Sequence, residues 1–314
     1  MDFSRPQSQV QVPAALTASQ NGDAWRVWTA ALPTLAEEFL ARWSLRLDGP
    51  PAHGAVALVL PVLQADGSPA VLKLQPVDEE THGEPLALRV WGTRHAVELL
   101  NCAPDSGAML LERLDATRTL ATVPDGTAAL EHLSGLLAHL VAVPAPAGLR
   151  LLADIAQAML DRVPTYCRSL ADSSERRLLA TCAAAVRELL DEPGARLLHW
   201  DLHYDNVLAP LPSAQVSGRA PWLAIDPKPL AGDPGFELLP ALRNRWDDVI
   251  GTADVSRAVR HRFHLMTEVV CLDRERAAGW TLGRVLQNCL WDIEDGAVTL
   301  QPEQTAIAHA LLGS

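Results

Sequence analysis

The densest run of chemically useful side chains is residues 199–206, with the sequence HWDLHYDN. Asp201 and Asn206 lie five positions apart, and Asp226 follows twenty positions later at the end of a short apolar run. Phosphoryl transfer from ATP needs a group that orients the attacking hydroxyl and accepts its proton, and metal ions that neutralise the phosphates. The pattern H-x-D-x4-N followed by an apolar strand and Asp is typical of kinase catalytic loops. It predicts Asp201 as the catalytic base and Asn206 and Asp226 as oxygen ligands of Mg²⁺.

A second interpretation of the same run is a metal-dependent hydrolase. His199, Asp201 and His203 alternate, and side chains that alternate along a strand can converge on one metal ion. This interpretation requires further His or Glu ligands downstream, and it offers no role for Asn206 or Lys73.

Lys73 gives independent support for a kinase. The chain has only two lysines, Lys73 and Lys228, and Lys73 lies on an apolar segment expected to be the third strand. A kinase needs a strand lysine to hold the α- and β-phosphates and a helix glutamate to orient it. We expect Glu84 to be that glutamate, with Glu79 and Glu80 as alternatives. Lys228 either contacts phosphate or pairs with an acid.

The elements that must position these residues fall into two groups. A polar arm over residues 1–21, expected to be loose, precedes an apolar helical pattern over 23–40. Pro33 is expected to divide this pattern into two helices. Strands are then expected at 43–47, 56–63, 70–75 and 109–112, with a hairpin turn at 65–68 and a helix over 81–92.

The remainder of the chain is predicted to be mainly helical. Helices are expected over 128–141, 152–160 and 173–190, strand and loop over 196–209 and 222–226, and helices from about 236 to the end. The sequence therefore predicts an α+β, bilobal protein: a β-rich N-terminal lobe over 1–112 and a mainly helical C-terminal lobe over 113–314. Glu112 and Leu114 lie in the connector, whose backbone could hydrogen-bond the adenine of ATP.

Composition limits the partners. The net charge of −12 argues against nucleic acid or an anionic membrane, and no apolar run is long enough to span a bilayer. The five cysteines lack disulfide or zinc spacing, so we expect them to be reduced and buried. The N-terminus lacks the pattern of a signal peptide. We expect a soluble, cytoplasmic monomer.

Several stretches together resemble the aminoglycoside phosphotransferase superfamily and, within it, the streptomycin 6-kinase and hydroxyurea phosphotransferase family. They are residues 111–114 (LERL), 198–206 (LHWDLHYDN), 225–226 (ID), 232–238 (GDPGFEL) and 286–296 (LQNCLWDIEDG). The resemblance runs from about Trp25 to the C-terminus. It implies a protein-kinase-like fold, ATP as donor, Mg²⁺, and transfer to the 6-hydroxyl of streptomycin.

The resemblance also implies residue roles. Asp201 is implied as the base, Asn206 and Asp226 as metal ligands, Lys73 as the ATP contact, and Asp233 as a brace for the catalytic loop. Two departures from the kinase pattern are visible. No glycine-rich phosphate loop is present, and Gly83 and Pro85 flank the expected helix glutamate.

The substrate side can be argued from charge. Streptomycin carries two guanidinium groups, which carboxylates and aromatic faces bind well. Trp291, Asp292 and Asp295 are the expected substrate contacts, because positions three apart share a helix face. Trp246-Asp247-Asp248 is a weaker candidate, and a solvated helix end is the alternative for the whole cluster.

These observations favour an aminoglycoside O-phosphotransferase. A kinase of another small hydroxyl compound, such as hydroxyurea or an amino alcohol, remains open. So does a catalytically silent, nucleotide-binding protein of the same fold, although such relatives commonly lose one of the four residues Lys73, Asp201, Asn206 and Asp226.

Overall fold

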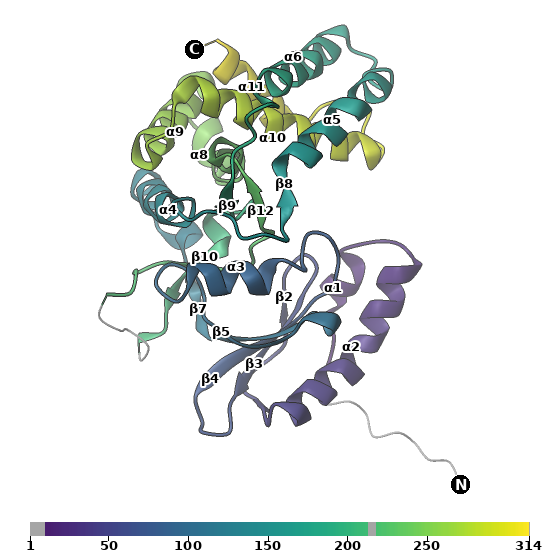
Figure 1. Ribbon diagram of the computed structural model, residues 1–314, viewed down its shortest axis with the longest axis vertical. Coiled ribbons are helices and arrows are strands. Elements are labelled where there is room, and N and C mark those ends of the chain that lie inside the picture. Colours follow the sequence, from purple (N-terminus) through teal and green to yellow (C-terminus); the bar gives the residue numbers. More distant parts are fainter. Residues whose placement is uncertain (1–9, 213–217, 314) are drawn as a thin grey trace. The chain divides into compact units, whose positions relative to one another are not determined.

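The computed structural model describes residues 10–212 and 218–313, and these separate into two units. The N-terminal unit contains residues 10–93, 97–114 and 210–212. The C-terminal unit contains residues 94–96, 115–209 and 218–313. Figure 1 shows the sheet of the first unit and the helices of the second.

An antiparallel sheet is the framework of the N-terminal unit. Its strands follow the order β1-β3-β4-β6-β5, and β2 pairs with the start of β3, on the same edge as β1. The hairpin between β3 and β4 turns at Gly67, whose φ of +84° suits glycine, so the predicted turn is confirmed. The strands are β1 (Arg46–Leu47), β2 (Ala52–His53), β3 (Leu58–Leu63), β4 (Pro69–Leu74), β5 (Leu99–Ala103) and β6 (Ala108–Glu112).

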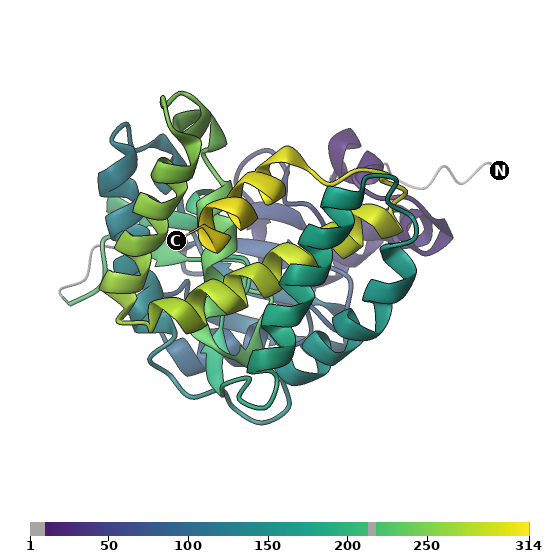
Figure 2. The same cartoon turned by 90° about the horizontal axis from the view of Figure 1, so that it is seen from above.

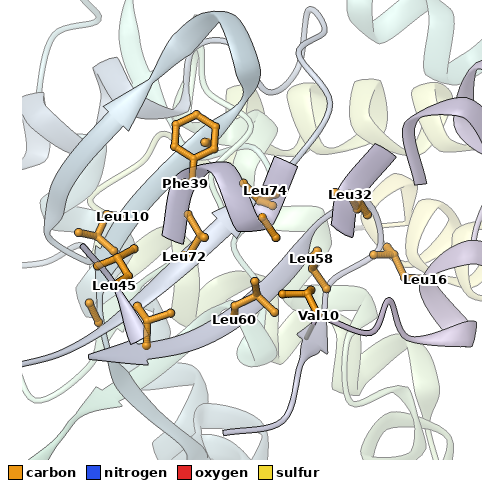
Figure 3. Close-up of a cluster of buried hydrophobic side chains, with 14 of the residues drawn as sticks. Val10, Leu16, Leu32, Phe39, Leu45, Leu58, Leu60, Leu72, Leu74 and Leu110 are labelled. Atoms are coloured by element: carbon orange, nitrogen blue, oxygen red, sulfur yellow. The ribbon is translucent and has the colours of Figure 1, made fainter. Parts of the chain in front are cut away.

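One face of this sheet is buried under two helices, α1 (Ala14–Ala18) and α2 (Asp23–Arg42). Alternate residues of β3 and β4, such as Leu60 and Leu72, point toward Leu32 and Phe39 of α2 (Figure 3). The prediction that Pro33 divides this helix is wrong. Proline removes one backbone hydrogen bond, but burying the apolar stripe on either side of it holds α2 continuous.

The described part of the predicted N-terminal arm is packed rather than loose. Val10 and Leu16 are buried in the same core as α2, so that expectation is wrong for residues 10–21. Apolar residues spaced a few positions apart indicate such packing, but the many polar residues between them made the arm resemble a loose segment. Residues 1–9 lie outside the described residues.

The opposite face of the sheet carries α3 (Glu84–Trp91). Side chains alternate along β4, so Lys73 points away from the face that Leu72 and Leu74 fill. The Lys73 ammonium group donates a hydrogen bond to Glu84, the first residue of α3. This face therefore positions the predicted lysine.

Helices dominate the C-terminal unit, and α10 lies alongside α6 while α4 packs on α9 (Figure 2). Its α-helices are α4 (Gly126–Leu140), α5 (Leu152–Tyr166), α6 (Ser173–Leu189), α7 (Leu238–Arg243), α8 (Trp246–Ile250), α9 (Val255–Val270), α10 (Arg274–Glu294) and α11 (Pro302–Leu312).

Two small sheets in this unit hold the polar run between them. One has the order β11-β10-β7 and the other β8-β12-β9, so residues 199–206 connect the second sheet to the first. The strands are β7 (Leu114–Thr119), β8 (Arg150–Leu151), β9 (Arg196–Leu198), β10 (Val207–Pro210), β11 (Leu223–Ala224) and β12 (Leu230–Gly232). Short 3-10 helices occur at Pro104–Ser106, Leu120–Thr122, Tyr204–Asn206 and Pro234–Glu237.

The cysteines differ from expectation. All five are free thiols, but only Cys182 and Cys289 are buried, while Cys271 is exposed. Cys271 ends α9 in the left-handed region, where its side chain faces solvent. No helix in the described part of the chain combines the length and the apolar character needed to cross a membrane.

Candidate active site

The buried ion pair of Lys73 with Glu84 is the polar centre of the N-terminal unit. The Lys73 Nζ lies 2.7 Å from both carboxylate oxygens of Glu84, and the two residues are 5% and 0% exposed. Gln75 also donates to Glu84, with 2.8 Å between Nε2 and Oε2. The predicted partner is therefore confirmed over Glu79 and Glu80.

The glycine and proline that flank Glu84 do not prevent this pair. Pro85 occupies the first turn of α3, where a backbone N–H has no partner within the helix and its absence costs little. Gly83 precedes the helix, and the Glu84 side chain reaches Lys73 of β4. The departure from the kinase pattern is thus accommodated by the helix start.

The connector residues Glu112 and Leu114 are fixed within the fold. The Glu112 carboxylate accepts the backbone N–H of Glu98 at 2.8 Å, and the Glu112 N–H donates to the Glu98 carbonyl at 3.0 Å. Arg113 pairs with Asp48 at 2.6 Å, and Leu114 is buried. This segment offers an ordered backbone, and its predicted contact with adenine stays a prediction.

His199 is a structural residue of the C-terminal unit. Its Nε2 donates to the Ile225 carbonyl at 3.0 Å, while its Nδ1 accepts the backbone N–H of Asp201 at 3.4 Å. Complete burial lowers the pKa of His199 to about 3, so the ring is neutral. With both ring nitrogens used, His199 cannot ligate a metal, and the hydrolase interpretation is wrong. Within the described residues, no group of three His, Cys, Asp or Glu side chains could hold a metal ion.

Asp201 lies in the wall of a cavity, beside His203. The distance between its Oδ2 and His203 Nε2 is 3.9 Å. Burial raises the pKa of Asp201, and the neighbouring His203 and Arg284 partly oppose that rise. A carboxylate with a raised pKa is a stronger proton acceptor than a free one, which is what a general base requires.

Asn206 is held by the loop it belongs to. Its Nδ2 donates to the Asp201 carbonyl at 2.9 Å and approaches the Asp201 carboxylate at 3.4 Å. This fixes the amide nitrogen on the Asp201 side, so the amide oxygen is the group that Asn206 can offer to a cation.

Asp226 follows β11 in a left-handed backbone conformation, with a φ of +56°. Its Oδ1 accepts a hydrogen bond from Lys228 Nζ at 3.0 Å, so Lys228 pairs with an acid. Two backbone hydrogen bonds, Ile225 to Asn206 at 2.9 Å and Lys228 to His199 at 3.0 Å, join this segment to residues 199–206. The structure thus brings the segments of Asp201, Asn206 and Asp226 together.

Glu237 stabilises the loop of residues 199–206 through a buried hydrogen bond. It is fully buried, and its Oε1 accepts the backbone N–H of Trp200, whose φ of +68° is a strained value for a bulky residue. Burial raises the pKa of Glu237 to about 8. Asp233, the expected brace, instead caps its own turn at Gly235 and pairs with Arg276 at 2.6 Å. Glu237 was not among the residues predicted from the sequence, although it lies in the GDPGFEL stretch.

The cavity beside Asp201 lies in the C-terminal unit and has a volume of about 580 Å³. Side chains from the catalytic loop, α7, the α7–α8 turn and α10 form its wall. They are Asp201, His203, Pro240, Arg243, Asn244, Arg245, Arg284, Asn288, Trp291 and Asp292.

A family model described as aminoglycoside/hydroxyurea antibiotic resistance kinase matches residues 42–296. The chain belongs to this kinase family. It is 57% identical to a streptomycin 6-kinase of Streptomyces glaucescens, over 97% of this chain and 98% of the relative. It is 52% identical to a streptomycin 6-kinase of Streptomyces griseus, over 96% and 97%. A hydroxyurea phosphotransferase of Kitasatospora aureofaciens is 53% identical over 97% of this chain and 86% of the relative.

Solved structures share the fold at low identity. A thermostable mutant of an aminoglycoside phosphotransferase, determined with ADP and hygromycin B, has a TM-score of 0.59 at 15% identity and covers 88% of this chain and 98% of its own. A choline/ethanolamine kinase family protein from Mesorhizobium loti has a TM-score of 0.56 at 15% identity, over 89% and 100%. The predicted bilobal, kinase-like α+β fold and the prediction of a phosphotransferase are confirmed, and a kinase of this family uses ATP.

The cavity of this antibiotic resistance kinase contains two of the three predicted substrate contacts. Trp291 and Asp292 line it, and burial raises the pKa of Asp292 while the nearby Arg243 opposes that rise. Asp295 does not line the cavity, because α10 ends at Glu294 and Asp295 is its exposed C-cap. The weaker candidate Asp248 is bound to Arg245 at 2.8 Å.

Three arginines, Arg243, Arg245 and Arg284, also line the cavity of the kinase. Their position in the cavity was not predicted from the sequence. Arg245 is bound by Asp248 and by the Val123 carbonyl at 2.7 Å. Arg284 donates to Gln287 and to the Trp200 carbonyl, and its guanidinium lies 4.5 Å from the Trp200 ring centroid. The guanidinium groups of Arg245 and Arg284 are therefore bound by other groups of the protein, and these contacts hold the cavity wall in place.

Proposed function

We propose that this kinase phosphorylates the 6-hydroxyl of streptomycin. Two streptomycin 6-kinases at 57% and 52% identity over nearly the whole chain support this proposal. The observation that carries it is the position of Asp201 in the wall of a cavity that also contains Asp292 and Trp291. A carboxylate and an aromatic face are the groups expected to bind a guanidinium.

In the proposed reaction, Asp201 accepts the proton of the attacking hydroxyl. The hydroxyl oxygen forms a bond to the γ-phosphorus of ATP, and the bond from that phosphorus to the bridging oxygen breaks, which yields ADP and the phosphate ester. The raised pKa of Asp201 supports this role, since the acceptor must compete for a weakly acidic proton. The hydrogen bond from Asn206 to the Asp201 carbonyl holds the loop in place.

The residues that are proposed to contact ATP and its metal ion are ones that other side chains or the backbone hold in place. Lys73, oriented by Glu84, is proposed to contact the α- and β-phosphates of ATP. The Asn206 amide oxygen and the Asp226 carboxylate are hard oxygen donors and fit Mg²⁺. When bound, Mg²⁺ supplies neutralisation of the phosphate charge. Lys228 would hold the Asp226 carboxylate in place.

Hydroxyurea is the second candidate acceptor, because one relative named for it is 53% identical. A silent nucleotide-binding role is disfavoured by the presence of Lys73, Asp201, Asn206 and Asp226 together.

A coupled ADP-release assay with Mg²⁺ and ATP tests the proposal on streptomycin, hydroxyurea and other aminoglycosides. We expect release that depends on streptomycin, and NMR of the product should place the phosphate at the 6-hydroxyl. Turnover of hydroxyurea alone would favour the second candidate, and the absence of ADP release with every acceptor would favour the silent role.

A further inference from the structure

Asn288 is a polar side chain in the cavity wall that the described structure leaves without a hydrogen bond. It lies on α10, is only 9% exposed and lines the cavity with Asp201. Within residues 10–212 and 218–313, no hydrogen bond to its side chain occurs. Its amide atoms are not fully buried, so they are accessible from the cavity, and a polar ligand in the cavity can hydrogen-bond to them.

Asn288 and Asp292 form a matched pair on one helix. Residues four apart on an α-helix differ by about 40° in direction, so both side chains face the same cavity, as their shared lining confirms. Trp291 lies beside them, with its ring 5.7 Å from that of Trp200. The pair offers an amide oxygen, a carboxylate and an adjacent aromatic ring.

The two candidate acceptors share one chemical feature. In streptomycin a guanidino group is attached to the carbon next to the one that bears the 6-hydroxyl. In hydroxyurea the hydroxyl is bonded directly to a urea nitrogen. Each therefore has a planar group with two nitrogens on one carbon close to the accepting oxygen. The groups differ in charge, because the guanidino group is a cation and the urea is neutral.

We propose that Asn288 and Asp292 form a subsite for this planar N–C–N group and thereby hold the neighbouring hydroxyl at Asp201. The inference rests on the proposed function and names the part of the acceptor that is recognised. The Asn288 oxygen accepts an N–H of either ligand. The Asp292 carboxylate adds a charge-assisted hydrogen bond only when the group is a cation.

The test uses hydroxyurea and hydroxyguanidine as competitors of streptomycin phosphorylation by the full chain. The two have the same size and shape, but hydroxyguanidine is protonated near neutral pH. For the wild type we expect competitive inhibition by both, with a lower inhibition constant for hydroxyguanidine. Asn288→Ala should raise both inhibition constants and the streptomycin KM about tenfold, with the KM for ATP unchanged.

Asp292→Asn should separate the two competitors. We expect it to remove the preference for hydroxyguanidine and to raise the streptomycin KM about tenfold, while the hydroxyurea constant changes less than about twofold. Asp295→Asn is the matched control, since it makes the same change one turn away outside the cavity. It should leave all constants within about twofold. Asn288→Asp keeps an acceptor of the same shape and should retain most of the streptomycin affinity.

The outcomes separate this inference from the proposed function. If streptomycin is phosphorylated normally by both Asn288→Ala and Asp292→Asn, or if neither competitor inhibits, the subsite is overturned and the function stands. If Asn288→Ala does not fold, Asp292→Asn and the two competitors still decide the charge discrimination. If the wild type does not phosphorylate streptomycin, the proposed function itself fails.

Discussion

The two units of this kinase hold their predicted functional residues in place by different kinds of contact. In the N-terminal unit, the Lys73 and Glu84 charges neutralise each other in a buried, bidentate contact. In the C-terminal unit, Asp201, Asn206 and Asp226 are held largely through backbone atoms, on a loop with strained residues at Trp200 and Asp226. The first arrangement fixes a cation in place, and the second holds carboxylate and amide groups on a loop. We propose that this difference separates the group that orients a phosphate from the groups that accept a proton or bind a metal.

The largest effect is expected from Asp201→Asn, which removes the proposed proton acceptor and keeps the shape of the loop. We expect kcat to fall by roughly 10² to 10⁴, the usual contribution of a positioned general base. The melting temperature and ATP affinity should change little. Steady-state kinetics with thermal unfolding test this, and wild-type turnover would exclude Asp201 as the base.

The ion pair of the N-terminal unit can be broken with Glu84→Ala. Removing one partner of a buried pair costs about 3–5 kcal/mol of stability, because the other charge stays in an apolar environment. Chemical denaturation measures this loss. Glu79→Ala is the control, since Glu79 is an exposed glutamate on the segment before α3. An equal loss in both variants would contradict the special position of Glu84.

The metal-binding side of the comparison is tested with Asn206→Ala and Asp226→Ala. Each removes one hard oxygen donor, so we expect activity to need at least about tenfold more Mg²⁺. A titration of activity against Mg²⁺ concentration gives the half-saturation point. An unchanged requirement in both variants would argue against these residues as ligands. Thermal unfolding identifies any variant that has lost its fold instead.

The smallest effect is expected for Glu237→Gln and depends on pH. Burial raises the folded-state pKa of Glu237 from 4.5 to about 8, so the folded protein binds a proton that the unfolded chain has lost. The contribution of this residue to stability is therefore present below about pH 4.5 and declines as the pH rises toward 8. Glutamine keeps the acceptor for the Trp200 N–H and cannot ionise.

We expect the variant to lose less stability than the wild type between pH 5 and pH 8. Melting temperatures of both proteins across this range, with activity measured in parallel, provide the check. Parallel curves would show that Glu237 does not titrate in this range.

The sequence by itself determined the kinase class and most of the residues that are proposed to react. The spacing of Asp201, Asn206 and Asp226 and the rarity of lysine pointed to the residues now found on one loop system and one strand. Such short-range patterns are readable because local backbone geometry depends on neighbours in the chain. The strands β3, β4 and β6 were predicted for the same reason, whereas β5, with its irregular pairing to β6, was not.

Only the tertiary structure decided which long-range partners these residues have. It chose Glu84 over Glu79 and Glu80, and it gave support of the loop to Glu237 instead of Asp233. It also placed Asn288 in the cavity and left Asp295 outside, because a helix end and the direction of its last turn depend on packing. Burial, pairing and the strained backbone at Trp200 arise from contacts between distant segments, and spacing along the chain does not specify them.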